Sequence, residues 1–234
     1  MKKIIQISLL LLAVLAFATT ASAQKKIKEG VVKFEMTTDD ESPEMALLGG
    51  TSLDFYFTEK MQRMDMNMMG GLMRIQTIIS NDNIKDATML MDMMGMKYQL
   101  TELSDDDISG SNNFMNMDQV ANVTYDPNDK KTIAGYPCYK ATVKMENDME
   151  MTYYITEKIQ PPMGLKKKEQ TQLKGYPLEM TIDTGMGMAM VFTATEVLSE
   201  VPKGSFTVPE GYTKKTMAEF QKEMGDFNFS PGGN

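Results

Sequence analysis

The sequence predicts a mainly β protein whose strands follow one another as an antiparallel meander, and three observations support this. Gly135-Tyr136-Pro137 and Gly175-Tyr176-Pro177 each open a run of alternating residues, then a turn and a second alternating run, as in a β-hairpin. Short alternating segments separated by Gly, Asn and Asp fill most of the remaining chain. Many methionines recur at every second position, which is the period of a β-strand.

The predicted elements follow in chain order. A first strand is predicted over 27–37, and a short helix over 42–48 with Ser42 as its cap and Pro43 in its first turn. Further strands are predicted over 53–57, 61–69, 72–79, 87–94, 96–100, 120–125 and 131–134, in the two Gly-Tyr-Pro hairpins, and over 205–208. A last helix is predicted over 216–224, where apolar residues share one side at helical spacing.

Residues 1–23 are predicted to be a signal peptide. Lys2 and Lys3 give a positive start, an apolar run covers 4–17, and Ala21-Ser22-Ala23 is a small-residue cleavage site. No cysteine follows Ala23, so the attachment used by bacterial lipoproteins is not available. We therefore expect an exported, periplasmic protein, cleaved after Ala23, which is neither a lipoprotein nor membrane-integral. An uncleaved N-terminal anchor is the alternative.

The mature chain is expected to form one domain. No segment rich in Pro, Gly or Ser divides residues 24–225, and 226–234 have the composition of a flexible tail. The single cysteine, Cys138, has no partner for an internal disulfide and lies in an alternating strand. We expect it to be a small buried core residue, so the fold must be held by its apolar core.

Composition argues against several classes of function. The formal net charge is −8, and a surface of this sign repels the phosphates of nucleic acids. Histidine is absent, which removes the commonest general base near neutral pH and the commonest zinc ligand. No nucleophile elbow, phosphate-binding glycine loop or zinc signature occurs. We therefore expect a non-enzymatic protein with no catalytic residues, no cofactor and no nucleic-acid partner.

The methionines are the candidate functional residues, since the chain has 26 of them. Their period of two places each set on one side of a strand, and together the strands would present a methionine-lined face. The candidate ligand-binding residues are Met64, Met66, Met68, Met89, Met91, Met93, Met149, Met151, Met186, Met188, Met190 and Phe192.

Four interpretations of this face remain open. It can be a solid core, because methionine fills irregular space well. It can be an adaptable apolar surface for a lipid or another apolar ligand. Met64, Met66, Met68 and Met69 can instead form a thioether site for Cu(I) or Ag(I), although a flat strand separates their sulfurs. The methionines can also act as sacrificial targets of oxidants.

The second half of the chain resembles a family of exported bacterial proteins, the domain of unknown function 4412 (DUF4412). The resemblance rests on four segments: 131–140, 154–158, 175–179 and 206–212. It implies a similarity to the LolA/LolB-like periplasmic lipoprotein carriers, whose fold is an unclosed antiparallel β-barrel with helices on its concave side. That family supplies no catalytic residues.

Together, the pattern and the resemblance predict a curved, unclosed antiparallel half-barrel with one or two short helices covering its concave face. The expected function is binding of a lipid, an acyl chain or another apolar ligand on the methionine-lined face. The alternatives are a Cu(I)- or Ag(I)-binding periplasmic protein and a structural envelope protein with a solid core. No particular protein partner is predicted.

Overall fold

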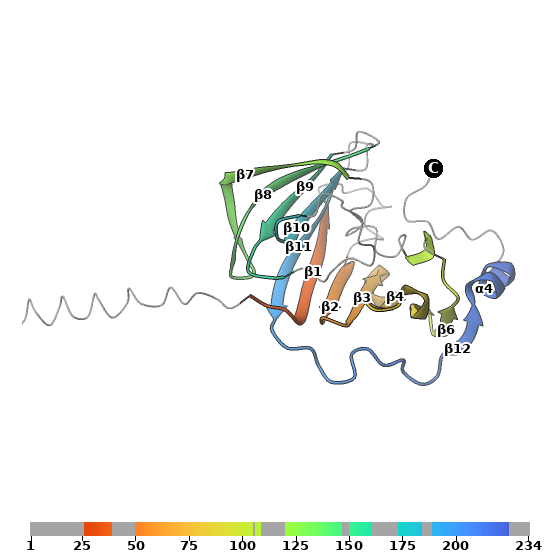
Figure 1. Ribbon diagram of the computed structural model, residues 1–234. Coiled ribbons are helices and arrows are strands. Elements are labelled where there is room, and N and C mark those ends of the chain that lie inside the picture. The colour runs from red at the N-terminus through yellow and green to blue at the C-terminus, as the bar shows by residue number, and fades with distance from the viewer. Residues whose placement is uncertain are drawn as a thin grey trace, which may run out of the picture.

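Twelve strands pair into one sheet that is not closed into a barrel (Figure 1). The computed structural model describes residues 26–38, 50–104, 106–108, 120–146, 150–160, 173–183 and 189–224. The strands are β1 (Gly30–Thr38), β2 (Ser52–Phe57), β3 (Met61–Met68), β4 (Met73–Ser80), β5 (Thr88–Met93), β6 (Met96–Thr101), β7 (Val120–Ile133), β8 (Tyr136–Met145), β9 (Glu150–Thr156), β10 (Tyr176–Asp183), β11 (Ala189–Leu198) and β12 (Thr213–Thr216). The predicted mainly β, unclosed sheet is confirmed.

The strands are arranged in the order β12-β6-β5-β4-β3-β2-β1-β11-β10-β9-β8-β7. Every neighbouring pair is antiparallel except β12 and β6, which are parallel. The sheet therefore consists of two meanders joined where β1 pairs with β11. Within the described residues, two 3-10 turns, η1 (Met69–Gly71) and η2 (Ile84–Asp86), a helical turn at 106–108 and the helix α4 (Met217–Met224) accompany it.

Three predicted strands require correction. The segment 205–208 is not a strand but a turn, because Gly204 has a left-handed φ of 84° and the Ser205 N–H donates to the Pro202 carbonyl. The last strand is instead β12, which reaches β6 after the chain has crossed the sheet. Two strands predicted over 120–125 and 131–134 are one strand, β7, with an irregular register between Asp126 and Lys130.

The helix predicted near the C-terminus is confirmed as α4. It begins after Thr216, whose hydroxyl accepts from the Glu219 N–H at 3.1 Å, while the Thr216 N–H donates to the Glu219 carboxylate at 2.8 Å. This reciprocal pair satisfies two donors that a helix start leaves unpaired. The helix predicted over 42–48, the signal peptide and the tail 226–234 lie outside the described residues.

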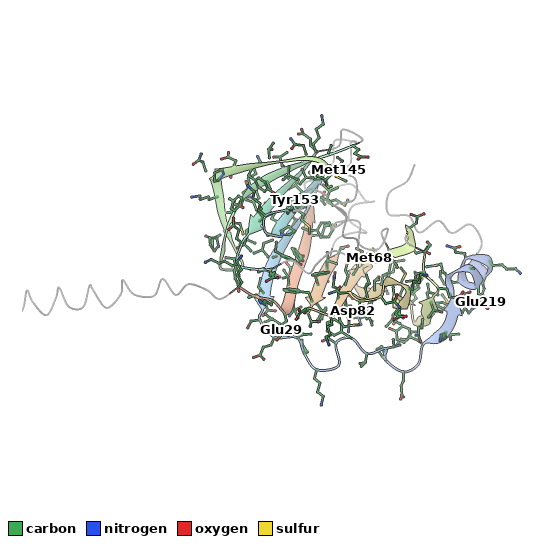
Figure 2. The ribbon with its side chains drawn as sticks, viewed as in Figure 1. Glu29, Met68, Asp82, Met145, Tyr153 and Glu219 are labelled. Carbon is green, nitrogen blue, oxygen red and sulfur yellow. The ribbon has the colours of Figure 1, made fainter. Side chains whose placement is uncertain are left out.

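The sheet curves strongly, and aromatic contacts identify its concave face. The ring centroid of Tyr176 in β10 lies 6.1 Å from that of Phe55 and 5.8 Å from that of Phe57, both in β2. Two strands, β1 and β11, separate β2 from β10, so a flat sheet would place these strands about 14 Å apart. The three rings can meet only on the inside of a curved sheet, where Tyr153 also lies (Figure 2).

The connection from β11 to β12 runs along the opposite, convex side, below the sheet in Figure 1. Arg63 of β3 is bidentate to Asp65 and donates to the Ser205 carbonyl of this connection. Gln76 donates to the same carboxylate at 3.0 Å. This network fixes the crossing segment and satisfies the buried Asp65.

Candidate ligand-binding face

The strand register places nine of the twelve candidate residues on the concave face. Met64 and Met66 stand opposite Phe55 and Leu53 of β2, so the alternating residues of β3 share the face of the aromatic rings. Following the ladders in both directions assigns the remaining members. They are Met64, Met66, Met68, Met89, Met91, Met93, Met151, Met190 and Phe192. Met149, Met186 and Met188 lie outside the described residues.

Most of these side chains are buried. Seven of them belong to the buried apolar residues, and only Met68 and Met190 are half-buried. Met64, Met66, Met151 and Phe192 belong to the larger core cluster, and Met89, Met91 and Met93 to a second cluster under α4. A ligand on this face would therefore have to displace packed side chains, which the flexible methionine permits more readily than a branched residue does.

The two ends of the concave face differ in composition. One end, which we call the aromatic end, consists of Phe55, Phe57 and Tyr176. The other end, the methionine rim, is a row across four neighbouring strands, in which each residue stands directly opposite the next, together with two turn residues beside it. The row is Met68, Met73, Met93 and Met96, and the turn residues are Met69 and Met94.

The two turn methionines have an unusual backbone. Met69 and Met94 have positive φ angles of 54° and 50°, and each precedes a glycine that also has positive φ. The two tips touch, because the Met94 N–H donates to the Leu72 carbonyl at 2.9 Å. Around them, large apolar side chains are open to water: Met69 is 40% exposed, Leu72 57%, Met94 78% and Met96 51%.

Helix α4 covers the end of the concave face nearest to β5 and β6 (Figure 1). Phe220 is buried against Met89, Met91 and Met93, and its ring lies 5.2 Å from that of Tyr98. The helix lies against β6 and β12, and its Phe220 side chain reaches the methionines of β5. The helix therefore covers the part of the concave face that β5 and β6 form.

Two buried hydroxyl groups on the concave face have no hydrogen-bond partner among the residues that the structure describes. They are Thr77 Oγ1, which stands between Met64 and Met89 in the register, and Tyr176 Oη, beside the phenylalanine rings. Burial raises the pKa of Tyr176 well above its ordinary value of 10. An unpaired buried hydroxyl costs about 1–3 kcal/mol, so both groups are placed to donate to an acceptor that enters this space.

Sequence analysis did not single out these hydroxyls as functional groups. Tyr176 belongs to the second Gly-Tyr-Pro motif. The motif predicts the start of a strand, but it does not predict which residues surround the phenol. Thr77 lies in a predicted strand, where a threonine is ordinary. The available signal is that Thr77 interrupts an otherwise apolar side of its strand, between Ile75 and Ile79.

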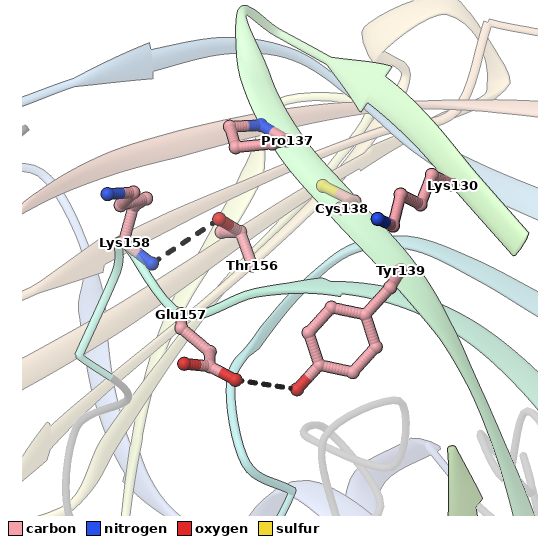
Figure 3. A pocket seen from close by; sticks show the side chains of 7 residues that line it. All are labelled: Lys130, Pro137, Cys138, Tyr139, Thr156, Glu157 and Lys158. Atoms are coloured by element: carbon pink, nitrogen blue, oxygen red, sulfur yellow. Dashed lines mark hydrogen bonds between the residues drawn. The ribbon is translucent and has the colours of Figure 1, made fainter. Parts of the chain in front are cut away.

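A pocket of about 240 Å³ lies elsewhere, where β8 begins and β9 ends (Figure 3). It is lined by Lys130, Pro137, Cys138, Tyr139, Thr156, Glu157 and Lys158. The Tyr139 hydroxyl donates to Glu157 at 2.9 Å. Burial, and to a smaller extent this hydrogen bond, raises the pKa of Tyr139 to about 12. Its volume is below that of ordinary ligand pockets, about 300–1,000 Å³, so we do not assign it the main ligand.

Cys138 is a free, buried cysteine, as the sequence predicts. Burial raises the pKa of its thiol to about 11, which keeps the thiol protonated near neutral pH. A protonated thiol is a poor nucleophile and a poor metal ligand. In the wall of the pocket, Cys138 therefore carries a thiol that is not activated.

The structure separates the four methionines first considered for Cu(I). Met64, Met66 and Met68 follow one another along β3, and residues two apart on a strand lie about 6.6 Å from one another. Met64 and Met66 are also buried in the core. Over the described residues, no group of three or more His, Cys, Asp or Glu side chains is placed to hold a metal ion.

A search for membrane-crossing helices covered the same described residues. None of the helices in that part of the chain has both the length and the apolar character that a membrane span requires.

The chain matches no protein-family model, and no curated protein matches it. It is similar to the MucA/MucB complex of Pseudomonas aeruginosa, with a TM-score of 0.44 and 10% identity over 77% of this chain and 56% of that one. It is similar to the lipoprotein LppX of Mycobacterium tuberculosis, with a TM-score of 0.37 and 12% identity over 74% of this chain and 88% of that one.

A third similar structure is an outer membrane lipoprotein-sorting protein domain from Vibrio parahaemolyticus. Its TM-score is 0.36 at 8% identity, over 82% of this chain and 95% of that one. Solved structures similar to this chain thus include a lipoprotein and a lipoprotein-sorting domain. At these scores the function has to be argued from the residues of the chain itself, and membership of DUF4412 stays a prediction.

Proposed function

We propose that the protein binds a lipid or another acyl-chain ligand on its concave face, without catalysing a reaction. The observation that carries the proposal is the unclosed sheet whose described concave side, from β9 to β6, is lined mainly by apolar side chains. Such a face gains free energy of about 25 cal/mol for each Å² of ligand surface that it removes from water.

Methionine gives this face its adaptability. Of the nine candidate residues on this face, eight are methionines, whose side chains are unbranched, and one is Phe192. A methionine core can repack around chains of different length and saturation at low cost, because each side chain has several accessible rotamers. We therefore propose a ligand class with variable acyl chains.

The two unpaired hydroxyls indicate a polar group on the ligand. Thr77 and Tyr176 can each donate a hydrogen bond to an ester or carboxyl oxygen that enters between the aromatic end and the centre of the face. A purely hydrocarbon ligand would leave them unpaired. The proposed ligand therefore carries at least one acceptor oxygen near its apolar chain.

Export completes the proposal. Residues 1–23 have the pattern of a cleaved signal peptide, so we place the mature protein in the periplasm as a non-integral protein. The net charge of −8 opposes a nucleic-acid partner and keeps the outer surface soluble. A structural envelope protein with a solid core is the competing function, and the burial of seven candidate side chains favours it.

A pair of neighbouring substitutions distinguishes the two functions. Met190 and Val191 are adjacent, both half-buried in β11, and they point to opposite faces because successive residues of a strand alternate. Binding of a fluorescent acyl probe to the purified mature protein is measured for the wild type, Met190→Asp and Val191→Asp. Met190→Asp should weaken binding at least tenfold, and Val191→Asp should leave it within twofold.

Native mass spectrometry of the protein purified from its own envelope provides the second measurement. A released adduct that is heterogeneous in acyl-chain steps would support the carrier function. A bare protein that also fails to bind the acyl probe would leave the solid-core interpretation standing.

A further inference from the structure

The row of the methionine rim has a geometry that binding of an apolar ligand does not require. Met68, Met73, Met93 and Met96 stand opposite one another in four neighbouring strands, all on the concave face. Directly opposed residues have Cβ atoms about 4.5–5.5 Å apart. Since methionine is flexible, sulfurs of adjacent strands can turn toward a common point. Sulfurs that follow one another along β3 cannot do so as easily.

The turn residues beside the row, Met69 and Met94, have a left-handed backbone that methionine rarely adopts. Met94 and Gly95 form a two-residue hairpin loop with both φ angles positive, a turn in which Asn-Gly is the favoured pair. Met94 is nevertheless a large apolar side chain, left-handed in backbone and 78% exposed. A strained backbone and an exposed thioether at one residue indicate that the side chain itself has a use.

Accessibility separates the rim from the rest of the face. Met96 is 51% exposed, and Met68 and Met73 are half-buried, whereas Met64 and Met66 are buried in the core. The contact between the two hairpin tips, through the Met94 N–H and the Leu72 carbonyl, brings Met69 and Met94 to the same corner as the row. Five of these six thioethers, all except that of the buried Met93, thus lie where an ion from solution can reach them.

We propose that the methionine rim is a site for a soft monovalent cation, Cu(I) or Ag(I), held by the thioethers of three consecutive members of the row, Met68, Met73 and Met93 or Met73, Met93 and Met96, with Met69 and Met94 beside them. Soft thioether ligands select Cu(I) over the harder divalent metals. The ligands are neutral and bind without losing a proton, so the affinity should not change between pH 5.5 and 8. The site shares Met68 and Met93 with the proposed acyl-binding face, but it does not depend on binding of an acyl ligand.

The first test is a titration of the mature protein, carrying ¹³C-methyl methionine, with Ag(I), followed by NMR. At one equivalent, the shifts should be confined to the methyl groups of the rim. Anaerobic competition with a Cu(I) chelator then gives the affinity. A variant with Leu at Met68, Met73, Met93 and Met96 should lose at least 100-fold in affinity, because leucine keeps size and apolarity but removes the sulfur.

The matched control carries Leu at Met64, Met66, Met89 and Met91, four buried methionines of the same strands. Its Cu(I) affinity should stay within threefold of the wild type. Shifts spread over methyl groups throughout the protein, or equal affinity in the rim variant, would show adventitious thioether binding only and overturn the proposal. So would an affinity that falls as the pH is lowered from 8 to 5.5.

A single substitution keeps the test decisive if the fourfold rim variant does not fold. Met94→Asn introduces the favoured turn residue, so it should raise Tm by about 2 °C while it lowers Ag(I) affinity at least tenfold. Ala134→Asn is the control, since Ala134-Gly135 forms the same kind of turn between β7 and β8 with φ angles of 47° and 82°. It should raise Tm without changing affinity. Full affinity in Met94→Asn would overturn the argument from the strained turn.

Discussion

The aromatic end and the methionine rim are two ends of one sheet face, and they differ in the rigidity and the burial of their side chains. At the aromatic end, three rings from strands that are not neighbours pack with centroids 5.8–6.1 Å apart and are almost fully buried. At the rim, flexible thioethers from neighbouring strands are partly open to water. The difference indicates that rigid rings fix the curvature of the sheet, whereas the rim consists of flexible side chains that are mostly open to water.

The largest expected effect is at the aromatic end. Phe57→Ala should lower the free energy of unfolding by about 3–5 kcal/mol, because it empties a fully buried position and removes the contact that holds β2 against β10. Met68→Ala, at the half-buried rim, should cost less than about 2 kcal/mol, below the range for fully buried methionines. Urea denaturation of both variants measures the difference. Equal losses would mean that the rim supports the fold as much as the rings do.

The buried tyrosines of the concave face should make the stability of the fold depend on pH. Burial raises the pKa of Tyr176 well above 10, and that of Tyr153 to about 12. A phenol whose pKa is higher in the folded state stabilises the fold below its unfolded pKa, near 10, and this contribution is lost as pH rises further. The protein should therefore lose stability progressively above pH 10. Tyr176→Phe should reduce this alkaline loss, as seen in Tm measured from pH 8 to 11.

At neutral pH the same two tyrosines should behave differently. Tyr176→Phe removes an unpaired buried hydroxyl and should leave stability unchanged or raise it by about 1 kcal/mol. Tyr153→Phe removes a hydroxyl that donates to Met151 Sδ at 3.4 Å, and should give no gain. If Tyr176→Phe is instead destabilising by the same amount as Tyr153→Phe, the Tyr176 hydroxyl has a partner in solution. Acyl-probe affinity should fall in Tyr176→Phe alone.

How far the sequence predicts this molecule depends on the range of the interaction. Alternation along β3 and β5 predicts their methionines on one side, because the period of two is a local property. The order of the strands is not local. That β1 pairs with β11, or that β12 returns to lie parallel to β6, depends on which edges close around the core.

Prediction of the candidate metal site from the sequence is limited in the same way, because the strand order decides which methionines lie side by side. The chain order suggests Met64, Met66, Met68 and Met69 as a metal set because they are close in sequence, whereas the register joins Met68 to Met73, Met93 and Met96 across strands. The strand predicted over 205–208 is wrong for a local reason. Apolar residues after Gly204 imitate a strand, but the positive φ of that glycine turns the chain.

The smallest expected effect concerns two similar hairpin turns, Ala134-Gly135 and Met94-Gly95, of which only the second belongs to the proposed cation site. Ala134 and Met94 occupy the same position of similar hairpin loops, and a left-handed backbone costs either residue about 1 kcal/mol relative to a permissive one. Asn at each position should therefore recover a similar fraction, about 0.5 kcal/mol, in urea denaturation. If Met94→Asn stabilises clearly less than Ala134→Asn, the Met94 side chain contributes packing at the tip. Similar gains would mean that the thioether of Met94 contributes nothing to folding, which is the condition expected of a residue retained for binding.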